Sequence, residues 1–428
     1  MFSKEKITVD KIIIQGKQAL NGKLHISSSK NAFLPILSAC ILCEDEIVLQ
    51  DFPRFTDVDN MINILKNFGA KVVKQENNLI INCKNLNNHE IPSTLSSVIR
   101  SSIFSLGPML GRFRSAKVAY PGGCDIGNRP INLHIKGLEC LNVKINEKFG
   151  MIHCDGSNMK GGMVYFDFPS VGATENVMMA AVLCKGTTKI INAAKEPEIV
   201  DLQNFLNKMG AHIRGAGTGV IEIIGVKKLK GTIYKPISDR IITGTYMIAA
   251  AITGGKVTLE NACPEFLPSL ISKLKLSSCK INVKNDIITV QSDKALKCIP
   301  HIETQPYPGF ATDLQPQIMT LQCCSKGSSL IVENLFETRF KHVPELVKMG
   351  ADITVNGRNA FVRGVDKLYG AEVTAYDLRG GAALVLAGLK AEGTTVVQNV
   401  HFIDRGYENI EQQLALLGAK IYREKNSS

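Results

Sequence analysis

The chain has 428 residues, of which 45% are hydrophobic and 21% charged, and its formal net charge is +11 at pH 7. This length and composition indicate a globular protein of two or three domains whose core needs no disulfides, and no apolar run approaches the roughly 20 residues of a membrane span. The basic residues are dispersed without interleaved aromatic side chains, which argues against nucleic acid as a partner, and a small polyanionic substrate explains the positive charge equally well.

The N-terminal segment MFSKEKITVDKIIIQG alternates charged and β-branched residues, so we expect no signal peptide there. Cys40 and Cys43 form a CxxC pattern at the end of the apolar run NAFLPILSACIL, and we interpret both as core residues. The other cysteines are scattered, without the paired spacing typical of zinc sites. This usage predicts reduced thiols in a cytosolic protein.

Six segments, spaced about 70 residues apart, share one ending, in which a helix stops at a cap and a strand follows directly. Glycine or asparagine at such a cap favours the left-handed backbone conformation that ends a helix. An apolar helix and a β-branched strand recur before each ending, so each repeat is predicted to alternate strands with two helices, which gives an α/β fold. The predicted cap residues are Gly69, Asn142, Gly210, Ser278, Gly350 and Gly418.

The residues that lead into the six apolar helices are mostly basic. A helix N-terminus attracts anions and disfavours basic side chains, so basic residues there are explained by a bound polyanion. If the repeats pack symmetrically, the six N-termini face a shared region and form an anion site; the alternative is a set of surface charges at helix starts. These residues are Lys30, Arg100, Ser170, Arg240, Asp313 and Arg379.

The loop PGGCDIGNRP, from Pro121 to Pro130, places Cys124 after two glycines and before Arg129. Glycines allow the backbone to approach a ligand closely, and a nearby arginine favours the thiolate form of cysteine. The loop therefore either presents a reactive thiol or is a surface turn with an incidental one.

Further arginines, Arg339 and Arg405, stand in other connectors, and guanidinium groups bind phosphate and carboxylate in a bidentate manner. Asp313 is the acid among the basic helix starts, where surrounding cations keep a carboxyl group ionised. It is predicted to act as a base or an orienting group for a bound hydroxyl. The alternative is a structural N-cap.

In order along the chain, the segments KNAFLPIL, PGGCDIGNRP, SVGAT, EPEIVD, SDRIITGT, ATDLQ, FETRF, DLRGGAALVLAG and IDRGYE occur between about residues 12 and 424. By these segments the chain resembles the enolpyruvyl transferases. The resemblance implies two similar domains, each an inside-out α/β barrel of three repeats. It also implies that the chain crosses between them near residues 21 and 236. Residues 1–21 and 236–428 would form a discontinuous domain, and residues 22–235 an inserted domain with the Cys124 loop.

The implied activity transfers the enolpyruvyl group of phosphoenolpyruvate to the 3′-hydroxyl of UDP-N-acetylglucosamine and releases phosphate, as the first committed step of peptidoglycan synthesis. Addition followed by elimination needs cations around the phosphate and carboxylate, an acid for the methylene carbon and an orienting group for the sugar hydroxyl. The resemblance implies no metal and no organic cofactor, and the two substrates are the expected partners. The alternatives are a sister transferase with another hydroxyl acceptor and a UDP-sugar-binding regulator without turnover.

The resemblance also implies roles for single residues. Cys124 matches the proton donor, which fosfomycin alkylates, and catalytic roles fall on Lys30, Asp313 and Arg405 as well. Asn132 and Pro169 differ from the residues common in the family. These differences affect the expected binding of the uracil and diphosphate part of the UDP-sugar. Phosphoenolpyruvate would be bound by Lys30, Asn31, Arg129, Arg339, Arg379 and Arg405. UDP-N-acetylglucosamine would contact Arg100, Arg129, Pro130, Ile131, Asn132, Leu133, Ser170, Val171, Gly172, Asp313 and Leu335.

Overall fold

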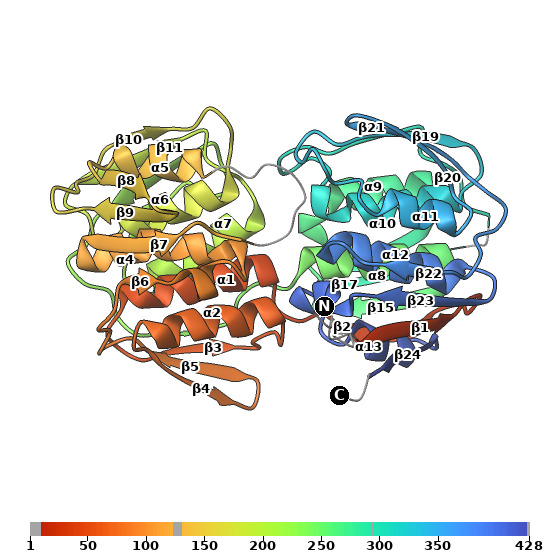
Figure 1. The fold of residues 1–428 in the computed structure, drawn as a ribbon, viewed down its shortest axis with the longest axis horizontal. Coiled ribbons are helices and arrows are strands. Elements are labelled where there is room, and N and C mark those ends of the chain that lie inside the picture. The colour runs from red at the N-terminus through yellow and green to blue at the C-terminus, as the bar shows by residue number, and fades with distance from the viewer. Residues whose placement is uncertain (1–9, 123–130, 293–294, 426–428) are drawn as a thin grey trace, which may run out of the picture. The chain divides into compact units, whose positions relative to one another are not determined.

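The computed structural model describes residues 10–122, 131–292 and 295–425, and in it the chain forms two compact units (Figure 1). The terminal unit holds the described residues up to Ile26 and from Asp239 onward, and the inserted unit runs from Ser27 to Ser238. The expected crossing near residue 21 would separate strand β2 (Asn21–His25) from its parallel partner β15 (Lys256–Glu260). The chain therefore leaves the terminal unit after Ile26 rather than near residue 21, and it returns after Ser238.

The inserted unit contains three four-stranded sheets with one common plan. In each, a short edge strand pairs in parallel with the second strand, and the remaining neighbours pair antiparallel. The sheet orders are β14-β3-β5-β4, β6-β7-β9-β8 and β10-β11-β13-β12. The strands are β3 (Ile47–Gln50), β4 (Lys71–Gln75), β5 (Asn78–Asn82), β6 (Glu90–Ile91), β7 (Ser115–Ala119), β8 (Lys144–Lys148), β9 (Met151–Asp155), β10 (Met163–Tyr165), β11 (Thr187–Ile191), β12 (His212–Arg214), β13 (Val220–Ile224) and β14 (Ile233–Tyr234).

The terminal unit repeats this plan in the orders β2-β15-β17-β16, β18-β19-β21-β20 and β22-β23-β1-β24. In both units a strand distant in sequence completes a sheet, since β14 joins β3 in one and β1 lies between β23 and β24 in the other. These pairings close each unit into a ring of three repeats. The other strands are β1 (Lys11–Gln15), β16 (Lys280–Lys284), β17 (Ile287–Gln291), β18 (His301–Glu303), β19 (Ser328–Val332), β20 (Asp352–Asn356), β21 (Asn359–Arg363), β22 (Glu372–Thr374), β23 (Thr394–Gln398) and β24 (Lys420–Glu424).

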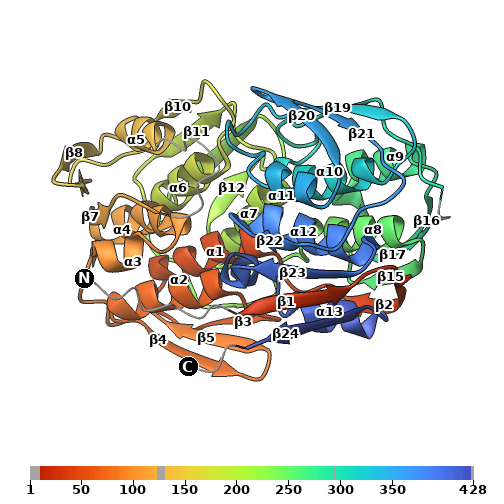
Figure 2. The same cartoon turned by 45° about the vertical axis from the view of Figure 1, so that its right-hand side comes forward.

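The apolar helices form the interior of each unit, and the sheets lie outside them (Figures 1 and 2). All 14 residues of α8 are buried, as expected of a helix that is apolar on every face. The predicted inside-out α/β barrel with six repeats is thus confirmed. The interior helices are α1 (Lys30–Ala39), α4 (Leu106–Phe113), α6 (Val171–Ala181), α8 (Arg240–Thr253), α10 (Gln315–Cys323) and α12 (Leu378–Lys390).

The amphipathic helices bury one face, and short helical turns connect several elements. Within the described part of the chain, no helix is long and apolar enough to span a membrane. The amphipathic helices are α2 (Thr56–Asn67), α5 (Asn132–Glu139), α7 (Pro197–Lys208), α9 (Pro268–Leu276), α11 (Val343–Lys348) and α13 (Ile410–Leu416), and the short elements are α3 (Ser93–Ser96), η1 (Cys40–Leu42), η2 (Arg100–Ser105), η3 (Pro264–Phe266), η4 (Thr312–Leu314) and η5 (Val400–Arg405).

All six predicted caps have the left-handed backbone conformation, with φ between 62° at Asn142 and 102° at Gly69. After each cap, the next N–H donates to a carbonyl oxygen five residues earlier, as Ala70 does to Leu65 and Cys279 does to Leu274. This bond satisfies a helix-end carbonyl group and turns the chain into the following strand. The shared ending is therefore one structural motif used six times.

Cys40, which begins η1, and Cys43, which follows it, are both buried, and neither pairs in a disulfide. Burial raises the pKa of both thiols, which keeps them protonated. The prediction that this CxxC pattern is part of the core is confirmed. The described residues contain no group of three or more His, Cys, Asp or Glu side chains that could hold a metal ion.

Candidate active site

In the terminal unit, three side chains that the sequence singles out lie together. The carboxylate of Asp313, in η4, accepts from Arg339 Nη2 at 2.8 Å through Oδ1 and from Arg379 Nη2 at 3.0 Å through Oδ2. Arg339 Nη2 also donates to the backbone oxygen of Thr312 at 3.1 Å. Arg339, from the connector before α11, and Arg379, from the first turn of α12, are thus brought to one carboxylate just before α10.

The two guanidinium groups are almost wholly buried, whereas the Asp313 side chain is 27% exposed. Among the described residues, Arg379 Nε and Nη1 and Arg339 Nε have no hydrogen-bond partner. A buried, charged N–H group without a partner is costly, so these donors indicate a site that receives an anion. The two arginines carry two positive charges and Asp313 carries one negative charge, so the cluster keeps a net positive charge that would attract the anion.

Arg379 keeps its charge despite its burial. Burial alone favours the neutral form, but the carboxylate of Asp313, with further help from Tyr407 and Asp239, outweighs it and raises the pKa of Arg379. The Arg379 guanidinium carbon also lies 5.5 Å from the ring centre of Tyr407, within the range of a cation–π contact. The group is therefore a permanent cation on a rigid support.

Asp313 does not cap a helix, since neither η4 nor α10 receives a side-chain cap. The caps of the neighbouring interior helices are other aspartates. Asp239 accepts from the N–H groups of Ile241 and Ile242 at the start of α8, and Asp377 accepts from those of Arg379 and Gly380 at the start of α12. These acids offset the unfavourable placement of basic residues in the first turn. The structural-cap alternative for Asp313 is therefore wrong.

The inserted unit presents the other three helix starts. Lys30 begins α1, is buried, and its Nζ lies 2.7 Å from Oδ2 of the buried Asp57. Arg100 begins η2, which runs directly into α4, and Ser170 caps α6 by accepting from Ala173 N–H at 3.4 Å. η2 contacts both α1 and α6, so the three elements that carry these residues pack together. Asn31 follows Lys30 in α1, and Val171 and Gly172 form the first turn of α6.

His134 is a buried residue beside these starts that the sequence reasoning missed. Its Nδ1 lies 2.7 Å from Nδ2 of Asn176, which also donates to Ile103 O, while Asn176 Oδ1 accepts from Gly107 N–H. An amide nitrogen donates, so Nδ1 accepts and the ring proton belongs on Nε2. That atom lies close to Gly172, where an added Cβ would be 3.2 Å away. In the sequence, His134 directly follows Leu133, a predicted contact of the UDP-sugar, and this adjacency was the signal that could have identified it.

The remaining predicted residues divide between described and undescribed parts of the chain. Ile131 precedes α5, which begins with Asn132 and Leu133. Leu335 donates its N–H to Glu333 in the loop after β19, and Arg405 ends η5. Three predicted residues, Cys124, Arg129 and Pro130, lie outside the described residues.

Comparison with known proteins identifies the family of this chain. The family model for EPSP synthase (3-phosphoshikimate 1-carboxyvinyltransferase) matches residues 14–414. The chain is 51% identical over 413 residues to UDP-N-acetylglucosamine 1-carboxyvinyltransferase 2 of Caldanaerobacter subterraneus subsp. tengcongensis, which covers 96% of this chain and 99% of the relative. It is 47% identical over 415 residues to UDP-N-acetylglucosamine 1-carboxyvinyltransferase of Geotalea uraniireducens, with 97% and 99% covered.

Two solved structures share the fold at low sequence identity. The enolpyruvyl transferase NikO from Streptomyces tendae has a TM-score of 0.87 at 21% identity, with 97% of this chain and 99% of that chain covered. EPSP synthase from Acinetobacter baumannii has a TM-score of 0.75 at 17% identity, with 97% and 100% covered. From the family model, the close relatives over nearly the whole chain and the shared fold, the chain belongs to the enolpyruvyl transferase family of EPSP synthase.

Proposed function

We propose that this protein transfers the enolpyruvyl group of phosphoenolpyruvate to the 3′-hydroxyl of UDP-N-acetylglucosamine and releases phosphate, as the first committed step of peptidoglycan synthesis. The observation that carries the proposal is the 51% identity, over 96% of the chain, to a relative named for this transfer. At the level of chemistry, it is supported by the buried arginines at Asp313, because the donor substrate carries both a phosphate and a carboxylate.

Phosphoenolpyruvate would be bound by the unpartnered N–H groups of Arg339 and Arg379 together with Lys30, Asn31, Arg129 and Arg405. The UDP-sugar would contact Arg100, the first turn of α6 and Leu335, in addition to residues 129–133. The N-terminus of α6 suits the diphosphate, since the first N–H groups of a helix point toward a bound anion. His134 adds a ring N–H beside Gly172, where it would contact the same ligand.

In the proposed mechanism, the 3′-hydroxyl oxygen bonds to C2 of phosphoenolpyruvate and gives its proton to the exposed part of the Asp313 carboxylate. Cys124 donates a proton to C3, which becomes a methyl group, so C2 is tetrahedral and still carries phosphate. A C3 proton then returns to the Cys124 thiolate, and the new double bond forms as the C–O bond to phosphate breaks. The arginines stabilise the negative charge on the leaving phosphate throughout.

The finer parts of the proposal concern the cell and the inhibitor. The protein would act in the cytoplasm, where its substrates are made, and its product would support cell-wall growth and division. Cys124 would be the residue that fosfomycin, an epoxide, alkylates. Each of these statements depends on the proposed transfer.

The deciding experiment measures phosphate release from phosphoenolpyruvate with different acceptors. Release that requires UDP-N-acetylglucosamine supports the proposal. Release with shikimate 3-phosphate supports the second candidate, which the description of the matching family model favours. Tight binding of UDP-N-acetylglucosamine without any phosphate release would instead identify a non-catalytic, UDP-sugar-binding protein.

A further inference from the structure

The segment that carries Arg405 is attached to the terminal unit on both sides of that residue. η5 ends at Arg405, and the N–H groups of Gly406 and Tyr407 both donate to Ile403 O at 3.1 Å, which closes a tight turn. Asp404 and Tyr407 flank Arg405 and Gly406. Each of these two flanking side chains belongs to a separate polar cluster.

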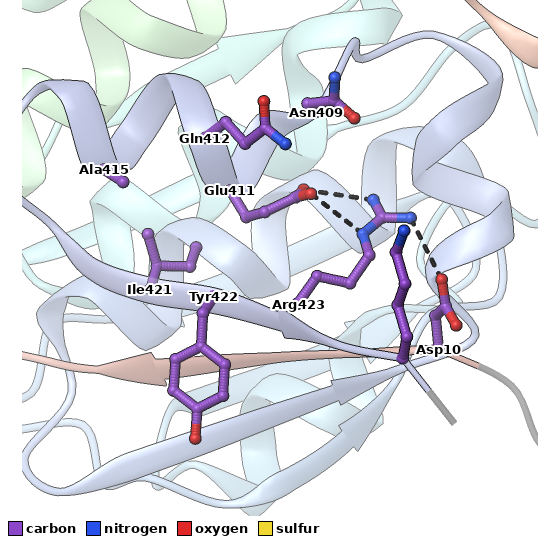
Figure 3. A pocket seen from close by; sticks show the side chains of 9 residues that line it. Asp10, Asn409, Glu411, Gln412, Ala415, Ile421, Tyr422 and Arg423 are labelled. Atoms are coloured by element: carbon purple, nitrogen blue, oxygen red, sulfur yellow. Dashed lines mark hydrogen bonds and ion pairs between the residues drawn. The ribbon is translucent and has the colours of Figure 1, made fainter. Parts of the chain in front are cut away.

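The first cluster is centred on Arg423 of β24 (Figure 3). Its Nη1 and Nη2 bind the two oxygens of Asp404 at 2.9 and 2.6 Å, a bidentate pair. Its Nε and Nη2 bind Glu411 at 3.0 and 3.2 Å, and Nη1 lies 3.6 Å from Asp10. Paired N–H···O bonds fix direction as well as distance, so β24 and α13 together fix the orientation of Asp404.

The Arg423 side chain is only 14% exposed, and that of Glu411 is 6% exposed. The hydrogen bonds that Arg423 donates to Asp404 and Glu411 outweigh burial and raise the pKa of Arg423, so its guanidinium group keeps its charge. Partly buried, multiply bonded ion pairs of this kind are held more firmly than single surface pairs. The side chain lines an open hollow beside α13, together with Glu411 and Asp10 (Figure 3).

The second cluster surrounds the hydroxyl group of Tyr407, whose side chain is 1% exposed. Thr245 donates to Ile241 O at 2.8 Å, so the Tyr407 hydroxyl is the donor in its 2.9 Å bond with Thr245 Oγ1. Gln317 Nε2 donates to both hydroxyl oxygens at 3.2 Å. The ring is therefore fixed to two interior helices, α8 and α10, and its face supports the Arg379 guanidinium.

We infer that Arg423 and Tyr407 are positioning residues for phosphoenolpyruvate: they hold the backbone on both sides of Arg405, and Tyr407 also holds Arg379. The inference rests on the proposed function, because it assigns both arginines to that substrate. A cation on an otherwise flexible connector would lose conformational freedom when it binds the anion, whereas a fixed segment has lost it already. Neither Arg423 nor Tyr407 needs to touch the substrate.

The test uses the full chain with Arg423→Gln, Arg423→Lys and Tyr407→Phe. We expect the KM for phosphoenolpyruvate to rise about tenfold in Arg423→Gln and Tyr407→Phe, as for residues one contact removed from a ligand. Arg423→Lys keeps the charge without the bidentate geometry and should rescue only part of this loss. The Kd for UDP-N-acetylglucosamine, measured by calorimetry, should change by less than about twofold, because these residues do not contact it.

Two matched controls lie in the same unit. Tyr422→Phe removes the hydroxyl of the residue next to Arg423, whose ring points away from the cluster (Figure 3). Arg363→Gln removes an exposed arginine whose ion pair with Asp352 is long, at 3.7 Å. Both should keep the wild-type KM for phosphoenolpyruvate.

The outcomes separate the inference from the proposed function. If the wild-type protein releases no phosphate with UDP-N-acetylglucosamine, the proposed function is wrong. If the wild type turns over and Tyr407→Phe keeps the wild-type KM for phosphoenolpyruvate, or loses affinity for both substrates equally, the inference is wrong. Tyr407→Phe removes one oxygen atom, so it decides the matter even where Arg423→Gln fails to fold.

Discussion

Asp313 holds two buried guanidinium groups of the terminal unit, one from the connector before α11 and one from the first turn of α12. Without its carboxylate, two cations would face each other in a site where each is 2–3% exposed. The residue therefore has two duties: it compensates charge in the folded protein, and in the proposed reaction it takes the proton of the sugar hydroxyl. Both duties depend on the negative charge rather than on the shape of the side chain.

Replacement of Asp313 by Asn tests both duties. We expect turnover to fall by about 100-fold or more, as for a lost general base. Since the two arginines lose their counter-ion, we also expect the free energy of unfolding to fall by about 1–3 kcal/mol. Added phosphate should restore part of the melting temperature, because an anion that binds only the folded state stabilises it.

The control is Asp352→Asn, which alters an exposed, long ion pair in the same unit. It should leave turnover and melting temperature unchanged, as surface pairs contribute little. Normal turnover in Asp313→Asn would contradict the proposed role of this residue. These quantities are measured by phosphate release and thermal unfolding.

At the scale of elements, the six helix ends show how one motif tolerates different residues. Four caps are glycines, while Asn142 and Ser278 adopt the same left-handed conformation with φ of 62° and 73°. A side chain with a Cβ atom is strained there, and serine more than asparagine. The strand that follows fixes the backbone of these caps through the repeated N–H bond.

This strain predicts opposite effects at equivalent positions. Ser278→Gly should raise the free energy of unfolding by about 0.5–1 kcal/mol, and Gly210→Ser should lower it by about 1 kcal/mol. A Cβ added at Gly210 meets no atom within 4 Å, so the loss there reflects conformation alone. Chemical denaturation measures both variants, and changes of the same sign would contradict the prediction.

A buried carboxyl group, that of Asp201, connects α7 to β14, the strand that closes the ring of three repeats in the inserted unit. Asp201 accepts from the Tyr234 hydroxyl at 2.6 Å and from Ile237 N–H at 3.1 Å. Burial is the main cause that raises the pKa of Asp201, to about 6. At pH values between the ordinary pKa of an aspartate and about 6, the carboxyl group of Asp201 is protonated in the folded state but ionised in the unfolded state.

Protonation of Asp201 therefore favours folding, and this contribution disappears as the pH rises through about 6. Asp201→Asn resembles the protonated acid at every pH. We expect the free energy of unfolding of the wild type, relative to this variant, to decrease by about 2 kcal/mol from pH 4 to pH 7. Denaturation of both proteins over this range measures the difference, and a constant difference would contradict the assigned pKa.

At the scale of the whole molecule, the cysteines differ greatly in reactivity. Alkylation requires the thiolate, and burial raises the pKa of most of the described cysteines. These protected thiols are Cys40, Cys43, Cys83, Cys154, Cys184, Cys279, Cys298, Cys323 and Cys324. In the proposed function, Cys124 is the reactive thiol.

Fosfomycin should therefore label Cys124 selectively, and UDP-N-acetylglucosamine should accelerate the reaction. Cys124→Asp should stay active and escape labelling, since a carboxyl group can donate a proton but resists the epoxide. Cys124→Ala should lose most of its activity. Peptide mapping and turnover measure these outcomes, and labelling spread over several cysteines or a fully active alanine variant would restore the interpretation of an incidental thiol.

The sequence by itself determined the local features of this protein. Repeat length, the six caps, the six interior-helix starts and the burial of Cys40 and Cys43 follow from periodicity and from the backbone preferences of a few residue types. Such signals act over one helix or one turn, so they can be recognised without knowing the fold.

Only the tertiary structure decided which distant groups meet. Because β2 pairs with β15, the boundary between the units lies after Ile26 and not near residue 21. The carboxylate of Asp313 binds two arginines and does not cap a helix. The tertiary structure also revealed His134 beside Gly172 and Arg423 beside Asp404. Strand pairs and buried ion pairs join residues far apart in the chain, and their energy depends on burial and geometry that no local pattern contains.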